Sequence, residues 1–161
     1  VNADLSNNYG NLIQRILTFV VKNCNSRINV QKNFNDFDKK LFDNFNLKFD
    51  EYKNFMNNLQ IDKAIKSIME ILSLTNSYVD EQAPWSLKKN DKERMEIVLY
   101  VTVNIILKST LMLNPIIPTS TEKVLSFFNM KIKDYNFSQL NNFINQDIII
   151  TSPIPIFPRI D

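Results

Sequence analysis

Residues 97–113 read IVLYVTVNIILKSTLML, and they predict the centre of the fold. Its apolar residues fall on every side of a helix, and a helix that is hydrophobic all round belongs in the middle of a bundle. Asn104 and Lys108 interrupt the stretch, so it lacks the ~20 uninterrupted apolar residues of a membrane span. The sequence therefore predicts a central core helix from about Asp91 to Asn114, and no membrane partner.

Amphipathic patterns before this stretch predict the helices that surround it. In residues 2–25, apolar side chains recur three and four positions apart, which is the spacing of one helix face. Residues 36–58 repeat the pattern with mostly aromatic side chains, starting at Phe37, and residues 61–81 repeat it with aliphatic ones. We expect all three segments to be helices that pack their apolar faces on the core helix.

Caps and prolines set the expected helix ends. Asp36 or Asp38 can accept hydrogen bonds from the first amides of the second helix. Pro84 disfavours helical geometry at Ala83 and should end the third helix. The polar residues that follow, 85–90, are then expected to form a connector between helices.

Two further helical segments are expected after the core helix. Pro118 breaks the chain, and Thr119 or Ser120 can cap a short helix that ends near Met130. Residues 136–143 are expected to add one more short helical turn.

The end of the chain differs in character. Pro153, Pro155 and Pro158 forbid a helix and favour an extended chain, yet the apolar residues between them favour burial. The sequence therefore predicts an all-α fold: an antiparallel helical bundle over residues 1–145, followed by an extended Pro-rich tail, 146–161. The tail should pack on the bundle or on another domain of a longer protein.

Composition excludes most common enzyme sites. The 161 residues include no histidine and one glycine, Gly10, which excludes histidine-based nucleophile systems, His-ligated metal sites and glycine-rich phosphate loops. Cys24 stands alone, so we expect neither a disulfide nor a metal site, and a reducing, cytoplasmic location. The net charge of +2 is too small for a general polyanion binder. The chain starts at Val1, and we expect it to be part of a longer protein.

Two groups of residues are arranged in a way that could carry function. Asn11 and Arg15 are four residues apart and share one helix face, and an amide beside a guanidinium can read the edge of a base. Trp85 is the only tryptophan and follows Pro84 in a polar segment. It could stack on an unpaired base or fold back to cap the bundle.

Five motifs occur in an order and at separations that resemble a known family, the C-terminal anticodon-binding domain of bacterial methionyl-tRNA synthetase. The resemblance covers essentially the whole chain. The motifs are NADL (2–5), GNLIQR (10–15), YVDEQAPW (78–85), NPIIP (114–118) and PIFPRI (155–160).

The resemblance implies roles for individual residues. In the family, an Asn and an Arg of the first helix and a Trp after Pro read the methionine anticodon, CAU. The matching residues here are Asn11, Arg15 and Trp85, with Pro84 shaping the turn and Asp80 as a neighbour. The Trp would stack on the wobble cytosine while Asn and Arg sort its Watson–Crick edge. Nearby cations could contact phosphates, namely Lys88, Lys89, Lys92, Arg94, Lys22 and Arg27.

The same resemblance implies what the chain lacks. The family's catalytic domain, which uses ATP and methionine, carries signatures that are absent here, so we expect no cofactor in this chain and no catalysis by it alone. The expected partners are the anticodon loop of tRNA(Met) and the protein's own catalytic domain, in a monomer. Related domains for branched-chain amino acids and cysteine share this architecture. A helical scaffold that docks a protein and has no RNA role is the alternative from another class.

Overall fold

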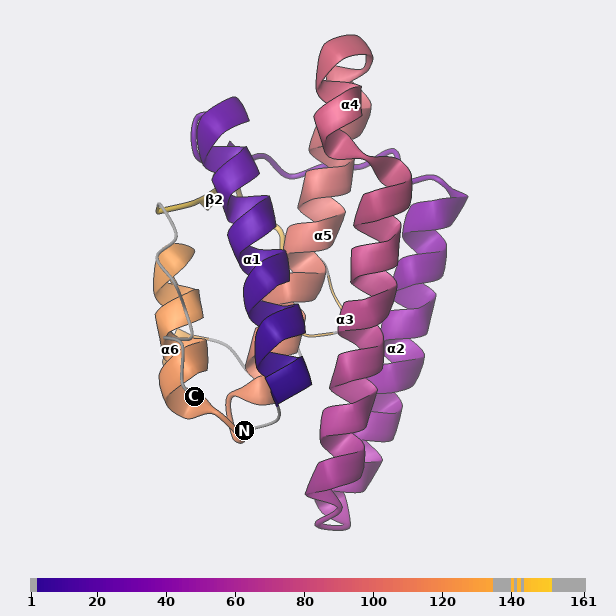
Figure 1. Ribbon diagram of the computed structural model, residues 1–161, viewed down its shortest axis with the longest axis vertical. Coiled ribbons are helices and arrows are strands. Elements are labelled where there is room, and N and C mark those ends of the chain that lie inside the picture. Colours follow the sequence, from indigo (N-terminus) through magenta and orange to yellow (C-terminus); the bar gives the residue numbers. More distant parts are fainter. Residues whose placement is uncertain (1–2, 135–139, 141, 143, 152–161) are drawn as a thin grey trace.

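The computed structural model describes residues 3–134, 140, 142 and 144–151. Its centre is helix α5 (Lys92–Leu113), which contacts α1, α2, α3, α4 and α6 (Figure 1). By length and composition α5 could cross a membrane, yet 94% of its most apolar 18-residue window is buried inside the protein. The prediction of a core helix over this stretch is confirmed.

The helices around α5 form the expected antiparallel bundle. They are α1 (Ala3–Asn23), α2 (Asp36–Asn57) and α3 (Ile61–Gln82), with α2 and α3 lying side by side as a long hairpin (Figure 1). The helix α6 (Pro118–Phe127) packs against α5 on the other side, and a short 3-10 turn, η1 (Ile132–Asp134), follows it. The all-α fold class is thus confirmed, and the apolar residues that share one face of α1, from Leu5 to Val20, are buried.

A small sheet that the sequence did not predict ties the chain end to the bundle. Strand β1 (Arg27–Ile28) pairs antiparallel with β2 (Ile148–Ile149). Beside this pair, Arg27 donates to the Asp147 carboxylate over 2.7 Å. The predicted tail therefore contacts the bundle as far as it is described. Its residues 152–161, and most of the helical turn predicted over 136–143, lie outside the described residues.

Two helix starts differ from the prediction. The cap of α2 is Asn35, whose side chain accepts from the Asp38 amide while the Asp38 carboxylate accepts from the Asn35 amide, a reciprocal capping box. Asp38 is thus the third residue of the helix, not its cap. The helix α6 begins at Pro118 without a side-chain cap, because proline itself is favoured in the first helical turn.

Two other predictions were wrong. Residues 85–90 are not a connector, since Pro84–Asn90 forms a helix, α4, that follows α3 directly. Phe37 was expected on the buried face of α2, but its side chain is 59% exposed. At about 100° per residue, Phe37 lies to the side of the buried face of α2, which Asp38, Phe45 and Phe49 share.

Candidate nucleic-acid interface

The break between α3 and α4 places the only tryptophan on the surface. Ala83 joins the two helices with φ 48° and ψ 68°, a left-handed conformation. The Ala83 amide donates to Val79 and ends α3, while its carbonyl accepts from Ser86 and Leu87 and starts α4. Pro84 is buried in the first turn of α4, and Trp85 beside it is 39% exposed. Trp85 therefore stands at the rim of the bundle with part of its ring accessible.

Arg15, Asp80 and Trp85 form one group although they come from α1, α3 and α4. The Arg15 guanidinium carbon lies 5.3 Å from the centre of the Trp85 ring, and its Nη1 donates to Asp80 Oδ1 over 3.0 Å. The Arg15 and Asp80 side chains are 41% and 62% exposed, so the ion pair adds little stability. Its effect is to hold a planar set of N–H donors beside an aromatic face.

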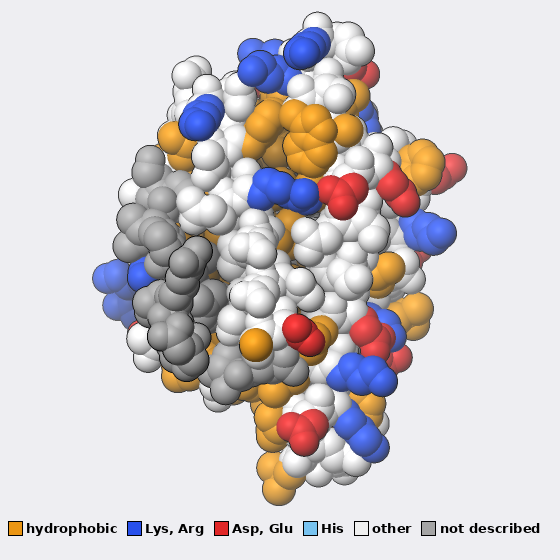
Figure 2. All heavy atoms as spheres, in the orientation of Figure 1, with side chains coloured by type: hydrophobic (Ala, Val, Ile, Leu, Met, Phe, Trp, Pro, Cys, Tyr) orange, Lys and Arg blue, Asp and Glu red, His pale blue; other side chains and the backbone are white. Residues whose placement is uncertain are grey.

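A polar hollow of about 340 Å³ lies between α1 and α3 next to this group. Asn11 and Asp80 line it, so the structure brings the predicted residues Asn11, Arg15, Asp80, Pro84 and Trp85 to one end of the α1–α3 face. Figure 2 shows this face, with an acidic and a basic side chain in contact above a strip of uncharged polar atoms. The other lining residues carry amides or hydroxyls, which can both donate and accept hydrogen bonds: Asn8, Ser73, Asn76 and Ser77.

Those four lining residues were not predicted as site residues. A signal for them was present, because Ser73, Asn76, Ser77 and Asp80 are three or four residues apart and so share one face of α3. An uncharged polar stripe on a helix is usually solvated, and only the packing of α1 against α3 turns this one into a hollow.

The predicted phosphate contacts divide into two groups. Lys88 and Lys89 are exposed in the last turn of α4, and Lys22 is exposed in the last turn of α1. Figure 2 shows basic side chains at the end of the molecule where Figure 1 places α4. Arg27 is bound to Asp147 instead. The exposed lysines therefore lie on the same end of the molecule as Trp85.

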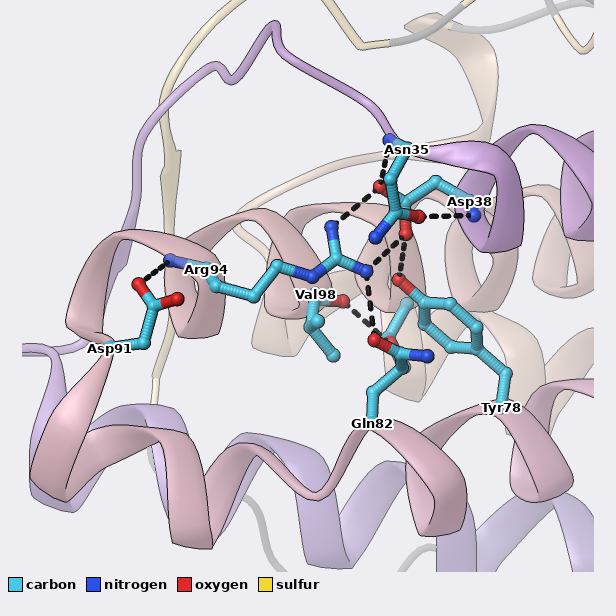
Figure 3. A network of polar contacts seen from close by, with 8 residues as sticks. Asn35, Asp38, Tyr78, Gln82, Asp91, Arg94 and Val98 are labelled. Atoms are coloured by element: carbon cyan, nitrogen blue, oxygen red, sulfur yellow. Dashed lines mark hydrogen bonds and ion pairs between the residues drawn. The ribbon is translucent and has the colours of Figure 1, made fainter.

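Arg94 has a different position from the one predicted. Its guanidinium binds both carboxylate oxygens of Asp38, at 2.7 and 2.8 Å, and Nη2 also donates to Gln82 Oε1 over 2.8 Å (Figure 3). The Arg94 side chain is 15% exposed and that of Asp38 is fully buried. Arg94 is thus part of an internal network that joins α2, α3 and α5, and its guanidinium does not face a phosphate on the surface.

This network keeps Asp38 ionised. Burial by itself raises the pKa of the Asp38 carboxyl, but hydrogen bonds from Arg94 and Tyr78 outweigh it and hold the pKa below its ordinary value. The Tyr78 hydroxyl donates to Asp38 Oδ1 over 2.6 Å. Burial and this bond to a carboxylate raise the pKa of Tyr78. Within residues 3–134, 140, 142 and 144–151, no group of His, Cys, Asp or Glu side chains is placed to hold a metal ion.

Comparison with known proteins gives a family match over residues 30–160, described as the anticodon binding domain of methionyl tRNA ligase. The methionine–tRNA ligase of Brucella suis is 32% identical over 98% of the chain, which corresponds to 31% of that protein. The methionine–tRNA ligase of Rhizobium meliloti is 31% identical over 99% of the chain and 31% of its own length. The chain thus spans about a third of the curated relatives it matches.

Solved structures agree with the sequence comparison. The free form of Mycobacterium tuberculosis methionyl-tRNA synthetase superimposes with a TM-score of 0.90 at 27% identity, over 99% of this chain and 33% of that one. The form bound by methionyl-adenylate gives 0.88 at 27% identity, over 98% of this chain and 32% of that one.

Proposed function

The chain belongs to the family of the anticodon-binding domain of methionyl tRNA ligase, and from this premise we propose that it recognises the CAU anticodon of tRNA(Met). The observation that carries the proposal is the group formed by Arg15, Asp80 and Trp85 at the rim of the polar hollow. It offers a stacking face and hydrogen-bonding groups at one accessible place. Single-stranded RNA loops are read by this combination, aromatic stacking together with hydrogen bonds to base edges.

The wobble cytosine is the base that this group fits. A cytosine edge carries one amino donor beside two acceptors, its ring nitrogen and its carbonyl oxygen. The guanidinium of Arg15 supplies donors for the acceptors, and the amide oxygen of Asn11 can accept from the amino group. Trp85 stacks on the plane of the base, with Pro84 fixing the turn. A uracil reverses the donor and acceptor at two of the three edge positions, so it loses the bonds at those two positions and keeps only the one to its carbonyl oxygen.

The exposed lysines give the RNA backbone its contacts. Lys88 and Lys89 are exposed in the last turn of α4, the helix that also carries Trp85, and Lys22 is exposed in the last turn of α1. Their charges attract phosphates, while the small net charge of +2 leaves specificity to the base contacts.

We infer that the activity belongs to a larger protein. The chain acts as the tRNA-positioning part of a cytoplasmic, monomeric methionine–tRNA ligase, whose catalytic domain uses ATP and methionine to aminoacylate the tRNA. The chain by itself has no catalytic site and needs no cofactor.

Fluorescence of Trp85 tests the RNA role, because no other tryptophan contributes to the signal. Adding an RNA hairpin with the tRNA(Met) anticodon stem and loop should quench Trp85 and saturate, whereas a hairpin with the same stem and a scrambled loop should leave most of the emission. Unchanged emission with both hairpins, at concentrations that saturate other tRNA-binding domains, would favour the alternative of a protein-interaction scaffold.

A further inference from the structure

The turn that presents Trp85 requires an external restraint. Ala83 is in the left-handed region, which disfavours every residue with a Cβ atom, and it alone separates α3 from α4. A single residue in this conformation sets the direction of all of α4, and with it the direction of the Trp85 ring. Glycine, the residue that would adopt the turn at no cost, is absent from this position.

The internal network ends on the residue just before this turn. Gln82 is the last residue of α3, and its Oε1 accepts from Arg94 Nη2 over 2.8 Å (Figure 3). Arg94 is itself fixed at three points: both oxygens of Asp38 bind its guanidinium, and the Asp91 side chain caps its amide over 3.1 Å. The guanidinium is therefore a rigid anchor, with its own carboxylate partner, against which Gln82 is held.

The other end of α4 is also bonded to Arg94, through its backbone. Asp91 is at once the last cap of α4 and the first cap of α5, and Arg94 lies in the first turn of α5. Arg94 thus bonds residues on both sides of α4: its guanidinium donates to Gln82 before the helix, and its backbone amide donates to Asp91 after it. A hydrophobic contact could stabilise these ends, but it would leave their direction less defined, since the bidentate pair fixes angles as well as distance.

We propose that Arg94 and Gln82 are positioning residues for Trp85: through the Asp38–Arg94–Gln82 chain of bonds they hold the left-handed turn at Ala83 and so orient the indole ring beside Arg15. Neither residue touches the RNA. The proposal rests on the proposed function only for the statement that Trp85 stacks on an RNA base. The orientation of the ring is a property of the free protein and can be measured without RNA.

Gln82→Met tests this, since methionine keeps the length of the side chain and removes the acceptor. The measurement is the time-resolved fluorescence anisotropy of Trp85 in the free protein. The amplitude of its fast component, which reports local motion of the ring, should about double. Gln82→Glu keeps an acceptor for Arg94 and should restore the wild-type decay. The matched control is Gln60→Met, at the start of α3, where the glutamine side chain makes no capping bond. A wild-type decay in Gln82→Met would overturn the proposal.

If Gln82→Met fails to fold, the same anisotropy measurement on Arg94→Lys tests the proposal. Lysine keeps a positive charge beside Asp38, but it cannot bind both Asp38 oxygens and also reach Gln82. The amplitude of the fast component of the Trp85 anisotropy decay should therefore increase again. Thermal unfolding separates loosening of Trp85 from loss of the fold. With RNA, Gln82→Met should lower the preference for wobble cytosine over uracil about tenfold and leave binding of a scrambled loop unchanged. If wild-type protein binds no hairpin, the proposed function fails, and the anisotropy still decides this proposal.

Discussion

The guanidinium of Arg15 lies over the ring of Trp85, 5.3 Å from its centre, although Arg15 belongs to α1 and Trp85 to α4. Asp80 of α3 binds the same guanidinium from the side. Three helices thus contribute to one surface group that has a charge, an aromatic face and a hydrogen-bond acceptor. Because this group is exposed while the network behind it is buried, its residues can be changed with little effect on the fold.

Trp85→Ala should weaken binding of the methionine anticodon hairpin by about 1–3 kcal/mol through loss of stacking. Isothermal calorimetry measures the affinity, and chemical denaturation measures the free energy of unfolding. Phe37→Ala is the matched control, since Phe37 is also an exposed aromatic residue, on α2. Equal losses of affinity in the two variants would contradict stacking on Trp85.

Arg15→Gln should lower the hairpin affinity by about 1.5–3 kcal/mol, the range for hydrogen bonds made by charged groups. Arg27→Gln is the control, because Arg27 also forms an exposed ion pair with an aspartate, at 2.7 Å. Both variants should change the free energy of unfolding by less than about 1 kcal/mol. The interpretation fails if Arg27→Gln weakens binding as much as Arg15→Gln.

Lys88→Ala combined with Lys89→Ala should change the salt dependence of binding and spare base preference. For a single-stranded loop, each lost phosphate contact should reduce the slope of log K against log salt by about 0.7. The same double change at Lys39 and Lys40, exposed on α2, should leave the slope as it is. If the double variant loses more of its preference for cytosine over uracil than of its affinity for the hairpin, the lysines of α4 read bases, and the prediction is contradicted.

Periodicity predicted most of the fold because burial follows it closely here. The stretch 97–113 is buried at every position, and the apolar face of α1 points inward throughout. Helix starts were harder to predict. Proline disfavours helical geometry in the residue before it, but it is itself favoured at the first position of a helix. Pro84 therefore ends α3 and also begins α4. The first effect alone predicts a connector where the structure has a helix.

The candidate site could be predicted only in part, because some of its contacts depend on how the helices pack. Asn11 and Arg15 are close in sequence, so their common face follows from helix geometry. The contact between Arg15 and Trp85 depends on how α1 packs beside α3 and α4, which spacing along the chain does not contain. The burial of Asp38 and Arg94 was missed in the same way, since both are charged residues at helix starts, where exposure is the usual outcome.

Asp38→Asn should destabilise the protein by about 3 kcal/mol at neutral pH, because it leaves Arg94 without its carboxylate. The folded-state pKa of Asp38 is lowered, so its contribution is complete above the unfolded pKa of about 3.9 and disappears as the pH falls through the folded value. Unfolding free energy, measured from neutral to acidic pH, should therefore fall less steeply in the variant. Asp50→Asn, which removes an exposed ion pair with Lys53, should follow the wild-type curve; parallel curves for all three proteins would refute this account.

Lys108→Met should remove the pH dependence of stability in the range where Lys108 titrates. Lys108 lies in the core near the rings of Phe42 and Phe45, and burial lowers its pKa to about 8. Between this value and the unfolded pKa of about 10.4, the unfolded chain binds the proton and the folded chain does not, so wild-type stability should rise with pH.

Denaturation curves between about pH 7.5 and 9.5 test the prediction for Lys108 below the range in which tyrosines ionise. The variant should lose the rise in stability that the wild type shows. Lys53→Met is the control, because Lys53 lies over Phe49 at 4.5 Å with 44% of its side chain exposed, and this variant should keep the rise in stability. A Lys108→Met variant whose stability rises with pH as the wild type does would contradict the prediction.

Above all, we propose that this domain reads the wobble base of the methionine anticodon. The most direct measurement is a competition at fixed salt between two hairpins that differ only in that base, cytosine in one and uracil in the other. The cytosine hairpin should bind at least about tenfold more tightly, a difference of about 1.4 kcal/mol, and the preference should disappear in Arg15→Gln. Equal affinities of wild-type protein for the two hairpins would contradict the claim.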